Sequence, residues 1–164
     1  MNEAPNPFAP PLAEVADIAV AGSEQARRST RLVAAIVDGI ILGAVFWVVF
    51  FLLFEELINP AAGFWVLPLY TLGGFVMFIL INGFLLDKHG QTVGKKLLGL
   101  RIVRSDGSRT TLARLVGLRY GVGYLIGAVP MAGSLYALVD VLLIFRASNK
   151  CLHDNIADTI VIKA

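Results

Sequence analysis

A run of apolar residues near the start of the chain, residues 32–54, constrains the fold more than any other feature. Every side chain in it is apolar or glycine except Asp38. At about 1.5 Å per residue the run forms roughly 34 Å of helix, which is enough to cross the hydrocarbon core of a bilayer. A carboxylate in hydrocarbon is costly unless another group compensates its charge. The run therefore predicts a membrane-spanning helix in which Asp38 has a specific partner or role.

Three further apolar regions follow, at residues 65–86, 111–129 and 133–146. Only 16% of the 164 residues are charged and 57% are hydrophobic, whereas soluble domains carry about 25% charged residues. We therefore predict an all-α membrane protein, a compact bundle of four transmembrane or membrane-embedded helices. The alternative is a Pro-kinked last helix over residues 120–145, which would give three spans.

The positions of the basic residues predict the topology. Lys and Arg precede the first helix, cluster between residues 88 and 114 and return near the C-terminus, whereas the linkers 55–64 and 128–133 contain none. By the positive-inside rule the basic segments, and with them both termini, lie in the cytoplasm. We expect a multi-pass protein of the bacterial inner membrane, with the lipid bilayer as its surroundings. The net charge of +2 is too small to indicate binding to nucleic acid.

Polar segments surround the apolar helices. Residues 1–26 form a Pro-rich, acidic tail that we predict to be disordered, and residues 27–164 form the membrane domain. Within the cytoplasmic loop, residues 87–110, "LGLRIV" alternates like a strand and "SDGS" is typical of a tight hairpin turn. Together with a C-terminal strand at residues 158–163, this loop predicts a small cytoplasmic sheet.

Four polar side chains inside the apolar regions lie at a similar depth, namely Asp38, Asn82, Arg119 and Asp140. Counted from the cytoplasmic end of each helix, the three charged groups lie roughly 9 to 12 Å into the bilayer, and Asn82 is slightly shallower. We predict an ion- or proton-binding cluster in which Asp38 and Asp140 are the titrating ligands. Arg119 would be their counter-charge, and Asn82 would donate a hydrogen bond. The alternative is a structural salt-bridge cluster that only fixes how the helices pack.

The remaining motifs indicate structure. "GQTVGKK", residues 90–96, lacks the spacing of a phosphate-binding loop. Instead, we predict that Thr92 caps a short amphipathic helix whose Lys95 lies at lipid headgroups. Arg31, at the start of the first helix, is expected to reach headgroups as well. The adjacent His153 and Asp154 predict a hydrogen-bonded corner in the C-terminal loop.

The sequence contains no motif for enzymatic chemistry. The single cysteine, Cys151, excludes an internal disulfide and a Cys-based metal cluster. The two histidines lie in no zinc-ligand pattern, and no nucleophile is paired with a base. We therefore expect no enzyme, no cofactor and no metal site.

Three motifs in order, "RRSTRLVAAIVDGIIL", "GQTVGKKLLGLRIVRSDG" and "LHDNIADTIVI", resemble the RDD family of small bacterial membrane proteins. The similarity runs over residues 26–163. The family is named for an Arg and two Asp; Arg31 and Asp38 match the first two, and either Asp140 or Asp154 matches the third. Asp158 stands where family members usually have Gly. The residues that carry the family motifs are Arg31, Gly90, Thr92, Gly94, Lys95, His153, Asp154 and Thr159.

The resemblance implies two functions. Some family members are implied to be cation/proton antiporters, and others look like accessory modules of membrane enzymes or quality-control machinery. We therefore predict a small-cation/proton transport module, and a homo-oligomer because one short chain encloses little space. The alternative is a non-catalytic scaffold or regulator that binds another membrane protein. Small residues at every fourth position of the first helix, Ala35, Gly39 and Gly43, would allow a second helix to approach closely.

Overall fold

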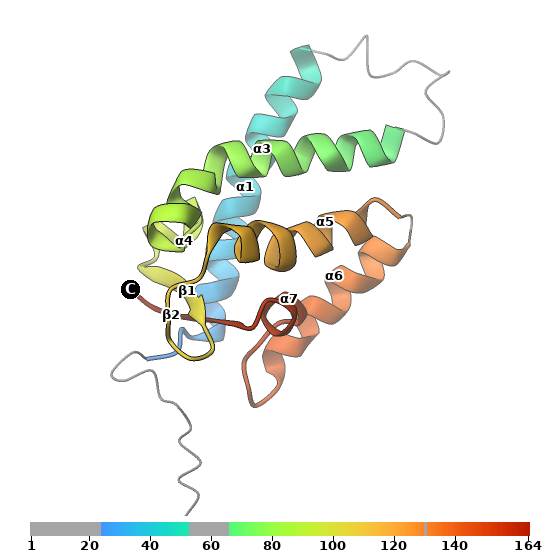
Figure 1. Ribbon diagram of the computed structural model, residues 1–164. Coiled ribbons are helices and arrows are strands. Elements are labelled where there is room, and N and C mark those ends of the chain that lie inside the picture. Colours follow the sequence, from blue (N-terminus) through green and yellow to red (C-terminus); the bar gives the residue numbers. More distant parts are fainter. Residues whose placement is uncertain (1–23, 53–65, 130) are drawn as a thin grey trace, which may run out of the picture.

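Figure 1 shows a computed structural model of the protein, which describes residues 24–52, 66–129 and 131–164. The predicted disordered tail lies outside the described residues except for residues 24–26, and the linker 55–64 lies outside them entirely. Helices make up most of the described chain. A two-stranded sheet lies at the end of the molecule that carries the C-terminus (Figure 1).

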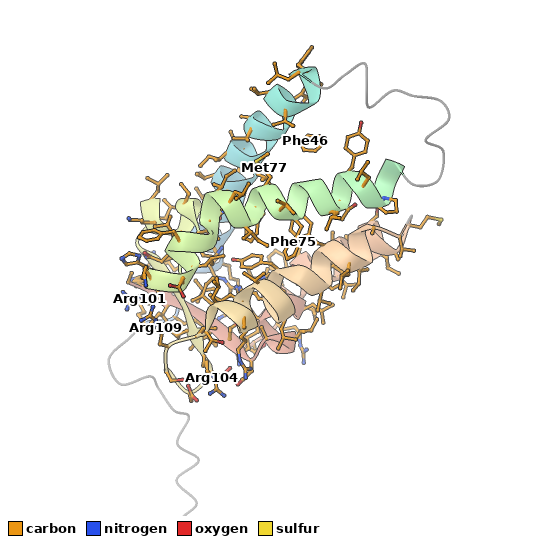
Figure 2. All side chains as sticks on the ribbon, turned by 45° about the horizontal axis from the view of Figure 1, so that its top comes forward. Phe46, Phe75, Met77, Arg101, Arg104 and Arg109 are labelled. Carbon is orange, nitrogen blue, oxygen red and sulfur yellow. The ribbon has the colours of Figure 1, made fainter. Side chains whose placement is uncertain are left out.

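Two long apolar helices, α1 (Arg28–Leu52) and α3 (Val66–His89), correspond to the first two predicted helices. Both are long and apolar enough, by length and composition, to cross a membrane. Many of their large side chains point outward, as the sticks in Figure 2 show: Leu52 is 77% exposed and Leu80 is 73% exposed. Phe78 and Leu86, in contrast, are buried in the core. Exposed apolar surface on this scale needs lipid or another protein to cover it.

The third and fourth predicted helices form a hairpin. A π helix, η2 (Arg114–Gly121), continues directly into α5 (Val122–Gly127), and the chain then reverses into α6 (Ala132–Leu142) and a short 3-10 turn, η3 (Leu143–Phe145). The two arms pack so closely that a Cβ atom built on Gly133 would lie 2.8 Å from the Cα atom of Gly127. In Figure 1 the arms run back alongside each other. The alternative of one kinked helix over residues 120–145 is therefore wrong.

The predicted pairing of two strands is confirmed. β1 (Leu100–Arg104) pairs antiparallel with β2 (Thr159–Lys163), in a register that places Leu100 opposite Lys163. The turn after β1 is closed by a hydrogen bond of 2.9 Å from the Arg104 N–H to the Ser108 carbonyl, as the "SDGS" sequence predicted. Ile102 and Val161 face the core from the two strands.

The predicted loop 87–110 is more ordered than the sequence indicated. α3 continues into it as far as His89, and the short helix predicted after Thr92 is present as α4 (Val93–Leu97), before β1. The Thr92 hydroxyl accepts a hydrogen bond of 3.4 Å from the backbone N–H of Lys95, so the predicted N-cap is confirmed. The Lys95 side chain, however, is only 11% exposed, and its predicted position at lipid headgroups is wrong. α4 packs against α1, with Lys95 turned inward.

Candidate functional site

An ionic cluster around Asp154 joins three parts of the fold. Asp154 lies in α7 (Leu152–Ile156), and its carboxylate is fully buried. It forms ion pairs with the guanidinium groups of Arg31, from α1, and Arg119, from η2. The Asp154 Oδ2 atom also accepts a hydrogen bond of 3.0 Å from the backbone N–H of Cys151. We call the three side chains Arg31, Arg119 and Asp154 the ionic lock.

The ionic lock corrects two predictions. The sequence placed Arg119 between Asp38 and Asp140, but the carboxylate that it contacts is that of Asp154. The sequence also placed Arg31 at lipid headgroups, but Arg31 is only 6% exposed and contacts Asp154. Both arginines share the single negative charge of Asp154 inside the protein.

The Asp154 carboxyl is held in its charged form. Burial alone would raise its pKa, but the charges of Arg119, His153 and Arg31 outweigh burial and hold the pKa well below its usual range. Asp154 is therefore ionised at neutral pH. Its fixed negative charge ties α1, η2 and α7 together.

Asp38 belongs to a second, separate cluster at the N-terminus of α4. Its carboxylate accepts hydrogen bonds of 2.6 Å from the Gly94 N–H and 2.5 Å from the Thr92 hydroxyl, and it lies 3.8 Å from the Lys95 ammonium group. The close approach depends on Gly94, because a Cβ atom there would lie 2.3 Å from the Ala34 carbonyl oxygen. The partner that the sequence led us to expect for the Asp38 carboxylate is therefore a helix N-terminus and a buried lysine.

Asn82 supports the same helix. Its side-chain oxygen accepts a hydrogen bond of 2.9 Å from the Val93 N–H, and its amide group donates one of 3.2 Å to the Phe78 carbonyl. The predicted layer of four polar groups thus separates into two sets. Asp38 and Asn82 contact and hold α4. Arg119 and Asp140 instead contact residues of α7.

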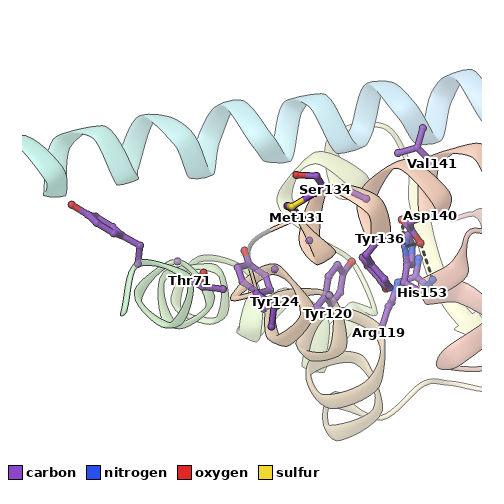
Figure 3. A pocket seen from close by; sticks show the side chains of 17 residues that line it. Thr71, Arg119, Tyr120, Tyr124, Met131, Ser134, Tyr136, Asp140, Val141 and His153 are labelled. Atoms are coloured by element: carbon purple, nitrogen blue, oxygen red, sulfur yellow. Dashed lines mark hydrogen bonds and ion pairs between the residues drawn. The ribbon is translucent and has the colours of Figure 1, made fainter. Parts of the chain in front are cut away.

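Asp140 contacts the histidine of the "LHD" motif (Figure 3). Its carboxylate lies 2.7 and 2.8 Å from the Nδ1 atom of His153, and it also accepts a hydrogen bond of 2.8 Å from the His153 backbone N–H. The sequence predicted a corner between His153 and its neighbour Asp154. These two side chains are 3.7 Å apart, so the shorter contact is with Asp140.

Two cavities meet at the Asp140–His153 pair. The larger, of about 910 Å³, lies between α3, η2–α5 and α6, and it extends to Met131 at the α5–α6 turn. The smaller, of about 440 Å³, lies between α1, α6 and α7, and it extends to Arg28 at the start of α1. Four residues line both cavities: Arg119, Asp140, Val141 and His153. The pair therefore stands in the wall between a cavity that reaches one end of the helices and a cavity that reaches the other.

The comparisons with known proteins identify one family. The model of the RDD family matches residues 26–158, which is most of the chain. The chain belongs to the RDD family. Neither the curated proteins nor the solved structures include a match. Two apolar helices and the family together make this RDD protein membrane-associated. Of the two candidates for the second family aspartate, Asp154 is the one that Arg31 contacts.

Sequence reasoning missed the central place of Asp154 and His153 in this RDD protein. Depth was counted only within the apolar helices, and α7 lies outside them. The signal that was available is Arg119, a permanent charge in an apolar region, which requires a carboxylate partner from somewhere in the chain.

Arg119 reaches Asp154 from a helix segment of unusual geometry. A π helix is wider than an α-helix and carries about one extra residue per turn. A Cβ atom at Gly121 would lie 2.6 Å from the Val116 carbonyl oxygen, whereas one at Gly117, in the same segment, would meet nothing within 4 Å. Only glycine fits at position 121 while the π helix is kept.

Replacing Gly121 by Ala should lower the free energy of unfolding by roughly 1–3 kcal/mol. The methyl group must either displace the Val116 carbonyl or force α-helical geometry, which would rotate Arg119 by about 100° away from Asp154. Thermal unfolding in detergent measures the effect. Gly117→Ala is the matched control and should unfold like the wild type. Equal losses of the free energy of unfolding in both variants would contradict the requirement for glycine at position 121.

Proposed function

We propose that this RDD protein is a transport module of the bacterial inner membrane that exchanges H⁺ for a small cation. The observation that supports this proposal is the pair of cavities on either side of Asp140 and His153. A transporter needs a binding group that can be reached from one side of the membrane and then from the other. A carboxylate in the wall between two cavities meets that requirement.

In the proposed topology four helices cross or enter the bilayer and both termini are cytoplasmic. The basic residues near the sheet and at the start of α1 support this orientation through the positive-inside rule. The smaller cavity, which extends to Arg28, then opens toward the cytoplasm. The larger cavity, which extends to the α5–α6 turn, opens toward the outer face.

We assign different roles to the charged groups. Asp140 is the ion-binding carboxylate, because it lines both cavities and a carboxylate suits H⁺ or a cation. The ionic lock behind it is a fixed frame. Asp38, which the sequence indicated as a titrating ligand, lines neither cavity and instead holds α4. We therefore assign transport to Asp140 and not to Asp38.

The proposal is tested in liposomes that contain the purified protein and a pH-sensitive dye. Addition of the transported cation should drive a pH change that Asp140→Asn reduces at least about tenfold. The replacement keeps the size of the side chain and an oxygen for the His153 N–H, so the fold should survive. Asp106→Asn, in the exposed turn after β1, is the control and should transport normally. Unchanged flux in Asp140→Asn would refute the assignment.

A scaffold that binds another membrane protein, or a second copy of this chain, is the second candidate. The observation that favours it is the small-residue face of α1. A Cβ atom built at Gly39 or Gly43 would meet no atom within 4 Å, and Ala35 is also exposed, so the face is open to another helix. A scaffold predicts no cation-driven pH change with any cation, in the wild type as well as in Asp140→Asn.

A further inference from the structure

Beside Asp140 and His153, which line both cavities, the smaller cavity is also lined by a cysteine, Cys151. Asp140, Cys151 and His153 offer a carboxylate oxygen, a thiol sulfur and a ring nitrogen, and these atoms all lie within 4.8 Å of one another. Asp140 comes from α6, whereas Cys151 and His153 come from the start of α7. No spacing in the sequence predicts this group, because Asp140 and Cys151 are 11 positions apart in the chain and come from different elements.

We propose that Asp140, Cys151 and His153 bind a transition-metal dication, with Zn²⁺ as the type case, and that this class of ion is the transported cation. The second half of the inference rests on the proposed function, but the binding site does not. Na⁺, K⁺, Mg²⁺ and Ca²⁺ prefer oxygen ligands, whereas a thiolate and an imidazole select zinc and related metals. A set of one sulfur, one nitrogen and one oxygen ligand therefore indicates zinc or a related transition metal.

The number of ligands suits an ion that must enter and leave. Structural zinc sites are closed by four protein ligands, whereas sites that exchange what they bind keep one position open. Here three side chains lie together, and Asp140 and His153 face the larger cavity (Figure 3). Tyr136 lines the same cavity, and its hydroxyl has no hydrogen-bond partner among the described residues. It is available to a water molecule in the open position.

The charges around the group are compatible with a dication. The Asp140 carboxylate and a Cys151 thiolate together neutralise two positive charges. Burial and the nearby Asp154 carboxylate raise the pKa of the Cys151 thiol to about 11, although Arg31, 3.8 Å from the sulfur, opposes this shift. The thiol is therefore protonated before a metal binds, and the metal itself must stabilise the thiolate. Arg31 and Arg119 are both paired with Asp154, which reduces their repulsion of a metal. Binding must displace the thiol proton, which passes to solution, so uptake of the metal is coupled to release of H⁺.

The binding site is tested with purified, tag-free protein in detergent, stripped of metal by a chelator. We expect one Zn²⁺ per chain in competition with a metal-sensitive dye. Co²⁺ should give the thiolate-to-metal absorption band in the near ultraviolet. Cys151→Ser should abolish the band, and His153→Asn should weaken Zn²⁺ binding at least about tenfold. His89→Asn removes the other, exposed histidine and should leave binding unchanged.

The possible outcomes test the metal-binding site and the identity of the transported ion separately. Equal Zn²⁺ binding in the wild type, Cys151→Ser and His153→Asn would overturn the site, as would no binding at all. Flux driven by Na⁺ or K⁺ without Zn²⁺ binding would overturn the inference and leave the proposed function intact. Site-specific Zn²⁺ binding with no Zn²⁺-driven H⁺ flux in liposomes would overturn the choice of transported ion.

Discussion

Replacing Asp154 by Asn should lower the free energy of unfolding by about 3–5 kcal/mol, the cost of removing one partner from a buried ion pair. The change leaves the guanidinium groups of Arg31 and Arg119 without a counter-charge, in positions where they are 6% and 2% exposed. Arginine cannot lose its proton to escape this cost. The loss should be visible as a large fall in melting temperature in mild detergent, or as failure to accumulate folded protein.

Asp158→Asn is the matched control, because it makes the same chemical change four residues later in the chain. The Asp158 side chain is 50% exposed, and its contact with Arg104 is 3.4 Å long. An exposed ion pair of this kind contributes about 0–1 kcal/mol. If the two variants unfold alike, the ionic lock does not stabilise the fold.

A second-site change distinguishes the loss of charge pairing from a general defect. Arg119→Leu in the Asp154→Asn background removes one of the two unpaired charges. The double variant should therefore be more stable than the sum of the two single changes predicts. Strictly additive losses would show that Arg119 and Asp154 do not interact.

Asp38→Ala should have the second largest effect on stability, a loss of about 2–4 kcal/mol. The carboxylate is the acceptor for the Gly94 N–H and the Thr92 hydroxyl, and it is the carboxylate nearest to the buried Lys95 ammonium. Its removal leaves these groups unsatisfied against α1. Amide hydrogen exchange should be faster throughout α4, and the melting temperature in detergent should fall.

Asp87→Ala is the control for this prediction. Asp87 is also an aspartate of a long helix, but its side chain is 43% exposed and its partner is the neighbouring Lys88, 3.2 Å away. The free energy of unfolding of Asp87→Ala should therefore lie within about 0.5 kcal/mol of the wild-type value. Slow, unchanged exchange of the α4 amides in Asp38→Ala would show that Asp38 does not hold that helix.

The helices could be predicted because their signals are local. An apolar run long enough to cross a bilayer, a break at residues 129–133 and a Thr at an N-cap act through neighbours in the chain, and each appears in the structure. The two strands were predicted for a similar reason, since both segments have the composition of strands. Their pairing was predicted because both were placed on the cytoplasmic side, not from a local signal. The family followed from three motifs in order.

The partners of the charged groups could not be predicted in the same way. Counting residues from the end of a helix gives the depth of a side chain, but not its rotation about the helix axis or the helix that it faces. Asp38 faces α4 because Gly94 allows α4 to approach α1 closely. Arg119 faces α7 from the wider turn of a π helix, which the apolar pattern does not reveal.

The sequence by itself determined that the chain makes apolar helices, a small sheet and an RDD-family fold, because hydrophobicity and motif order are properties of the chain. Only the tertiary structure decided that Arg31 and Arg119 share Asp154, and that Asp140 meets His153 between two cavities. Those contacts join segments far apart in the chain, 123 positions for Arg31 and Asp154, or join elements on either side of a hairpin or loop. Their geometry is set by the packing of α1, η2 and α6 around α7, and no local pattern encodes that packing.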